Sequence, residues 1–92
     1  MRTVAVVAGN LGEFQYFINE KLIEAKVYTV YQRKAIIGNF RYIYISRDRD
    51  LHGLVIDEIV YYGTFDNKPY SEIEYIRRVA MSRLRTGGSS AD

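Results

Sequence analysis

The 92-residue chain has no cysteine and a single histidine, His52. The absence of cysteine excludes disulfides, thiolate metal sites and cysteine nucleophiles. With one histidine, a metal site built from several histidines is excluded as well. The chain also has no run of about 20 apolar residues that would span a membrane, and the apolar run near its start is too short for a signal peptide. We therefore expect a cytoplasmic protein without membrane contact.

Neither sign of charge dominates, because 13 Lys and Arg residues are matched by 11 Asp and Glu residues, which gives a net charge of +2. Obligate DNA binders usually carry a stronger basic excess on one face, so nucleic-acid binding remains an alternative that the composition does not favour. The glycine patterns of the phosphate loop and of the dinucleotide fingerprint are absent. We therefore predict no cofactor.

Tyrosine is the aromatic residue that the chain uses most, with nine tyrosines and no tryptophan. Tyrosine rings offer amphipathic surface with a hydroxyl for hydrogen bonding, as at interfaces and stacking platforms. Base stacking on a sheet face is one interpretation, but helices that cover the sheet would hide that face. Packing or a subunit interface is the stronger interpretation, and it leads to the hypothesis of a homodimer through an edge strand or a tyrosine-rich surface.

The first structural unit is a strand followed by a helix. The continuous apolar run from Val4 to Ala8 is typical of a strand buried on both faces in a parallel sheet, and Gly9 ends it. Asn10 and Glu13 have the spacing of a capping box, in which each side chain accepts a bond from the other's backbone N–H. The helix that follows has one apolar face, formed by Leu11, Phe14, Ile18 and Leu22.

Later elements follow from the same patterns. Residues 40–46 alternate as a strand, residues 58–62 form another, and Val27 to Tyr31 is a less regular candidate with Gln32 to Lys34 as its turn. Residues 71–74 (Ser-Glu-Ile-Glu) predict a second capping box and helix. Its apolar face contains Ile73, Ile76, Ala80 and Leu84.

Together these elements predict an α/β fold: a small three-layer Rossmann-like domain with a short, mainly parallel sheet of three to four strands and two main helices. The domain is expected to span residues 1–85, and residues 86–92 are expected to be a flexible polar tail. Right-handed crossovers would place the first strand between the other two firm strands.

Ligands of such folds bind outside the carboxyl ends of the strands, where the winding of the chain reverses. That rule predicts one cleft, lined by residues 46–48 and 63–65 and by the first turn. The candidate ligand-binding residues are Gly9, Asn10, Phe14, Arg47, Gly63 and Thr64. A helix N-terminus attracts anions, but Glu13 adds a carboxylate to its first turn and would oppose a phosphate, so a simple helix cap is the preferred interpretation.

Asp48, Asp50 and His52 form a second candidate group, for a metal ion or for acid–base chemistry. Arg47 and Arg49 alternate with the two aspartates, and a solvated loop of mutually offset charges is the preferred interpretation. We predict no metal site and no catalytic residue, and an enzyme is not the favoured class.

Several motifs together resemble a group of small proteins encoded by tailed bacteriophages. They are Val-Val-Ala-Gly-Asn (6–10), Glu-Phe-Gln-Tyr-Phe (13–17), Arg-Tyr-Ile-Tyr-Ile (41–45), Leu-His-Gly-Leu (51–54) and Val-Tyr-Tyr-Gly-Thr-Phe (60–65). The similarity covers most of residues 3–84, with residues 26–39 as an apparent insertion. The resemblance implies a viral origin and a Rossmann-like or degenerate nucleotide-binding fold.

The leading functional hypothesis is a non-catalytic phage accessory protein that binds or regulates a host or viral partner in the host cytoplasm. The first alternative is a degenerate nucleotide-type ligand binder or enzyme that uses the cleft at the carboxyl ends of the strands. The second alternative is a nucleic-acid-binding protein.

Overall fold

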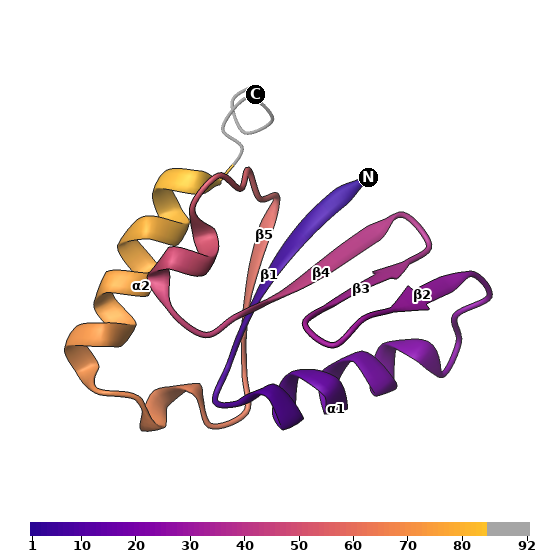
Figure 1. Cartoon of the computed structure of the whole chain (residues 1–92), viewed down its shortest axis with the longest axis horizontal. Coiled ribbons are helices and arrows are strands. Elements are labelled where there is room, and N and C mark those ends of the chain that lie inside the picture. Colours follow the sequence, from indigo (N-terminus) through magenta and orange to yellow (C-terminus); the bar gives the residue numbers. More distant parts are fainter. Residues whose placement is uncertain (85–92) are drawn as a thin grey trace.

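Strand β1 (Arg2–Ala8) runs through a five-stranded sheet of order β2-β3-β4-β1-β5 in this computed structural model (Figure 1). The structure describes residues 1–84, and of Asp48 only the backbone. The other strands are β2 (Tyr28–Val30), β3 (Lys34–Ile37), β4 (Phe40–Ile45) and β5 (Glu58–Tyr62). The helices are α1 (Leu11–Leu22) and α2 (Tyr70–Arg83), with short 3-10 helices η1 (Asp48–Leu51) and η2 (Phe65–Asn67). The chain is therefore a small α/β domain.

The pairing of the strands makes the sheet mixed. β1 is parallel to both β4 and β5, whereas β3 is antiparallel to β2 and to β4. The predicted position of the first strand, between the other two firm strands, is confirmed. The predicted three to four strands are too few, because residues 34–37 form β3 where the sequence suggested the end of a turn and an insertion.

Alternate residues of β1 enter two different hydrophobic clusters. Val4, Val6 and Ala8 pack with apolar residues of α1, and Ala5 and Val7 pack with those of α2 and η1. Residues 3–8 are all buried, which confirms the prediction of a strand buried on both faces. Burial of each large aliphatic side chain stabilises the fold by roughly 1.5–3 kcal/mol relative to exposure, so β1 is the centre of the core.

The N-terminus of α1 is only partly as predicted. Asn10 is the N-cap, and its side-chain oxygen accepts a bond from Glu13 N at 2.9 Å. The predicted return bond from Glu13 to the Asn10 amide is wrong, because the Glu13 carboxylate accepts from Gly9 N instead. The capping box therefore has only one of its two hydrogen bonds, and the Glu13 carboxylate faces the preceding turn.

Helix α2 begins at Tyr70, so the predicted capping box at Ser71 is wrong. Pro69 is its N-cap, with φ −55° and ψ 142° and no side-chain hydrogen bond. The Pro69 carbonyl already accepts bonds from the amides of Glu72 and Ile73 at 3.0 and 3.1 Å. The backbone of Pro69 therefore starts the helix without a cap from Ser71.

The polar link after β4 forms the short helix η1, and Gly53 follows it with a φ of +80°. The predicted flexible tail, residues 86–92, lies outside the described residues, as does residue 85 of the predicted domain. Among residues 1–84, no helix is both long enough and apolar enough to cross a membrane.

Candidate functional site

The three parallel strands bring three separate turns to one edge of the sheet. Gly9 and Asn10 follow β1, Ser46 and Arg47 follow β4, and the Gly63-Thr64 turn follows β5. Because β1 lies between β4 and β5, its turn is the middle one. The structure therefore places five of the six candidate ligand-binding residues at the carboxyl edge that the fold predicts.

Glu13 joins the turn after β1 to the turn after β5. Its Oε1 accepts hydrogen bonds from Gly9 N and Thr64 N, both at 2.9 Å, and its Oε2 accepts from the Thr64 hydroxyl at 2.8 Å. These three donors are of the kind that would bind the oxygens of an anionic ligand at a helix N-terminus. Here the carboxylate of the chain itself takes that position.

The two glycines at this edge leave no room for side chains. A Cβ on Gly9 would meet the Thr64 hydroxyl oxygen and would lie 2.6 Å from Glu13 Oε1. A Cβ on Gly63 would lie 2.5 Å from the same carboxylate oxygen, and the φ of Gly63 is +67°. Gly9 and Gly63 therefore permit the close approach of the two turns to Glu13, which gives both of them a structural role.

The hydrogen bonds also stabilise the charged form of Glu13. The Thr64 amide lowers the pKa of this carboxyl most, the Thr64 hydroxyl and the Gly9 amide lower it further, and desolvation opposes them. Glu13 is therefore ionised at neutral pH. With a lowered pKa it is a weak base for the Thr64 hydroxyl, so this pair does not resemble an activated nucleophile.

The surface beside Glu13 is a groove of about 520 Å³, lined by Asn10, Gly12, Glu13, Tyr16, Tyr62 and Gly63. The Asn10 side-chain oxygen is occupied by the helix cap. Phe14 lies below the edge rather than on it. Only 1% of Phe14 is exposed, and its ring packs 5.4 Å from that of Tyr44, so it belongs to the core.

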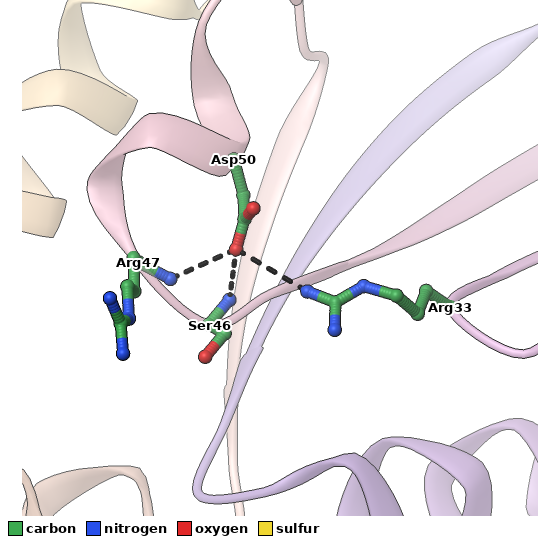
Figure 2. Close-up of polar contacts among 4 residues, drawn as sticks. All are labelled: Arg33, Ser46, Arg47 and Asp50. Carbon is green, nitrogen blue, oxygen red and sulfur yellow. Dashed lines mark hydrogen bonds and ion pairs between the residues drawn. The ribbon is translucent and has the colours of Figure 1, made fainter.

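Asp50 occupies the end of β4 as Glu13 occupies the ends of β1 and β5 (Figure 2). Its Oδ2 accepts hydrogen bonds from Ser46 N at 2.8 Å and from Arg47 N at 3.0 Å. The same oxygen lies 3.6 Å from a guanidinium nitrogen of Arg33. Two carboxylates of the chain therefore accept bonds from backbone amides along the carboxyl edge.

Arg33 comes from the β2–β3 hairpin, which reaches the end of β4. Its guanidinium lies 5.0 Å from the centre of the Tyr44 ring, and its carbonyl accepts from Tyr44 N at 3.0 Å. Arg33 was not among the site residues predicted from the sequence. The basic pair at residues 33–34 was the only signal, and without knowledge of the hairpin nothing linked it to β4.

Three arginines, Arg33, Arg47 and Arg49, line a pocket of about 220 Å³ together with Ser46 and Asp50. We call these three residues the arginine cluster. Figure 2 shows the Arg47 side chain pointing away from Asp50, and neither Arg47 nor Arg49 forms an ion pair with a side chain of the described residues. Among the described side chains that line this pocket, three carry a guanidinium group and one carries a carboxylate, so their net charge is positive.

In the other candidate group, Asp50 and His52 are not gathered into a site, and the side chain of Asp48 lies outside the described residues. Asp50 is bonded to backbone amides, and His52 is exposed. In the described part of the chain, His, Cys, Asp and Glu side chains do not meet in any group of three or more that could hold a metal ion.

No family model, curated protein or solved structure matches the chain.

Proposed function

We propose that the chain is a small non-catalytic binding module with a three-layer Rossmann-like core. Its role as a phage accessory protein, acting on a host or viral protein in the host cytoplasm, rests on the resemblance of its motifs. The order β4-β1-β5, parallel throughout, and the turn from β1 into α1 support the Rossmann-like part of the proposal.

The bonding of Glu13 carries this proposal. Nucleotide-binding Rossmann-like proteins leave the amides after the first strand free for phosphate oxygens. In this chain Gly9 N and Thr64 N donate to the Glu13 carboxylate instead. A phosphate would have to displace this carboxylate, and two anions at one place repel each other. A binding function without nucleotide chemistry is therefore the best account of this edge.

Thermal unfolding in the presence of nucleotides and cyclic signalling nucleotides tests the proposal. A ligand at a hundred times its Kd stabilises a protein by about 2.7 kcal/mol, which is readily seen as a rise in Tm. We expect no concentration-dependent rise in Tm and no turnover. Turnover of a nucleotide, or a saturable rise in Tm that is lost in Asn10→Ala, would overturn the proposal.

The arginine cluster favours a second candidate, a nucleotide-type ligand whose phosphate binds away from Glu13. Guanidinium groups bind phosphate oxygens in a bidentate manner, and Arg33 is already held in place by Tyr44 and Asp50. A ligand of this kind would leave Gly9 and Thr64 untouched.

The double variant Arg47→Ala/Arg49→Ala separates this candidate from the first. If ATP binds at the arginine cluster, isothermal titration will detect heat with the wild-type chain and a loss of affinity of tenfold or more with the variant. Arg77→Ala/Arg78→Ala, on the exposed surface of α2, is the matched control with the same change in charge. Equal affinity of all three proteins, or no binding at all, rules the second candidate out.

A further inference from the structure

Strand β2 is an open edge of the sheet. Among residues 1–84 it pairs with β3 alone, and Figure 1 shows it at the end of the sheet. Val27, Tyr28, Val30 and Tyr31 are between 48% and 75% exposed. An apolar edge strand with free backbone groups is a template for another strand, and natural edges usually carry charges or prolines to prevent this. Residues 27–31 contain neither.

The hydrogen bonds to β3 define which backbone groups of β2 are free. Tyr31 N donates to the Lys34 carbonyl, and Gly38 N donates to the Val27 carbonyl. In an antiparallel ladder, successive residues alternate between the two sides of the strand. Residues 27, 29 and 31 therefore face β3, and the N–H and C=O groups of Tyr28 and Val30 point away from the sheet.

We propose that β2 of a second copy of this chain pairs antiparallel with β2, about a two-fold axis at Thr29. The free backbone N–H and C=O groups of Tyr28 then form hydrogen bonds with those of Val30 in the second copy. The two-fold axis generates the same pair of bonds between Val30 and Tyr28 of the second copy. Val27 lies opposite Tyr31, and Thr29 lies opposite itself. Every cross-strand pair is thus aromatic with β-branched or threonine with threonine, and both kinds stabilise antiparallel sheets.

Because the backbone groups of successive residues point to alternate sides of the strand, the two strands can shift relative to each other only in steps of two residues. Both registers that differ by one such step have less favourable cross-strand pairs. One shift places Lys26 opposite Lys34, which brings like charges together. The other places Tyr28 opposite itself and Lys26 opposite the apolar Val30. The proposed register places Lys26 opposite Gln32 and contains no like-charge pair. The sequence around Thr29 is therefore self-complementary in a single register.

The opposite edge of the sheet is less open. Ile56, just before β5, forms a parallel bridge with Leu84, and its amide donates to the Arg83 carbonyl at 2.9 Å. The chain after α2 therefore already pairs with the beginning of that edge. In addition, β5 starts at the exposed Glu58, whose charge opposes self-pairing.

Disulfide trapping tests the register directly, because the chain has no cysteine of its own. Thr29 would face its symmetry mate in a non-hydrogen-bonded pair, where Cα atoms lie about 4.5 Å apart, within the range of a disulfide. Under mild oxidation, Thr29→Cys is expected to form a covalent dimer in high yield. Tyr61→Cys, exposed on the opposite edge strand, is the matched control and is expected to form little covalent dimer. Equal cross-linking of the two variants contradicts the proposal.

The molar mass of the wild-type chain provides a second test. Light scattering is expected to show twice the chain mass of 10.7 kDa at high concentration, with a fall towards the single mass on dilution. The double variant Tyr28→Lys/Val30→Lys is expected to be monomeric throughout and to keep the circular dichroism of the wild type. A monomeric wild type at every concentration overturns the proposal and leaves the edge to a strand of a different protein. Persistence of the dimer in the double variant overturns it as well.

Discussion

At the scale of the residue, Glu13 joins the turn after β1 to Thr64, which lies 51 residues beyond Glu13 in the chain. The sequence predicted its neighbour Asn10 as the helix cap, because that bond is made within one turn of helix. It did not predict Thr64 as a partner of Glu13, because that contact exists only after β1 and β5 have paired. The Asn10 cap was thus predictable from the residues, and the bonds that close the site were not.

Replacement of Gly63 by alanine is expected to destabilise the fold for two reasons. The φ of +67° is unfavourable for any residue with a Cβ, and the new Cβ would meet the Glu13 carboxylate. A loss of about 1–3 kcal/mol in the free energy of unfolding is expected. Gly38→Ala is the matched control, because its φ is +60° but no atom of residues 1–84 lies within 4 Å of the added Cβ. Equal losses in urea unfolding would show that Glu13 is not closely packed against Gly63.

The pKa of Glu13 predicts a dependence of stability on pH. Because folding lowers this pKa below its ordinary value of 4.5, the charged carboxylate stabilises the fold above that pH. The contribution is lost as the pH falls through the lowered pKa. Glu13→Gln should therefore be less stable than the wild type at pH 7, and the difference should shrink progressively below pH 4.5. A difference in urea midpoint that stays constant down to pH 2 would contradict this assignment.

At the scale of the element, the strands differ in how far their sequences reveal them. β1 is a continuous apolar run, and the pattern of residues 58–62 predicted β5 with its observed bounds. The candidate strand at residues 27–31 is confirmed as β2, but β3 and its pairing with β2 were not predicted, because both strands are short and Gln32-Arg33 is not one of the usual hairpin turns. Its position became clear only through the pairing of β3 with β4, which is a tertiary contact.

Asp50 is expected to stabilise the connection between β4 and η1. Its carboxylate satisfies the amides of Ser46 and Arg47, as a helix-capping side chain does, and Arg33 lies beside it. Asp50→Ala should lower the free energy of unfolding by about 0.5–2 kcal/mol. Glu74→Ala removes a carboxylate whose ion pair, with Arg77, lies on the surface of α2, and it should cost almost nothing. If thermal unfolding finds the two losses equal, Asp50 does not serve as a cap.

At the scale of the whole molecule, the carboxyl edge of the sheet is where open α/β sheets bind ligands. In this chain two carboxylates occupy that edge. Glu13 closes the ends of β1 and β5, and Asp50 closes the end of β4. The order of β4, β1 and β5 could be predicted from right-handed connections alone. The positions of the Glu13 and Asp50 carboxylates at this edge could not be predicted, because they depend on which side chains meet once the strands lie side by side.

The backbone amide resonances of Gly9 and Thr64 provide the most direct test of the central claim, that Glu13 occupies the position of an anionic ligand. A heteronuclear NMR titration of the wild-type chain with ATP follows both amides at once. If the carboxylate holds them, their chemical shifts will stay constant up to millimolar ATP, whatever happens at the arginine cluster. Saturable shifts of both amides, with a common Kd, would contradict the claim.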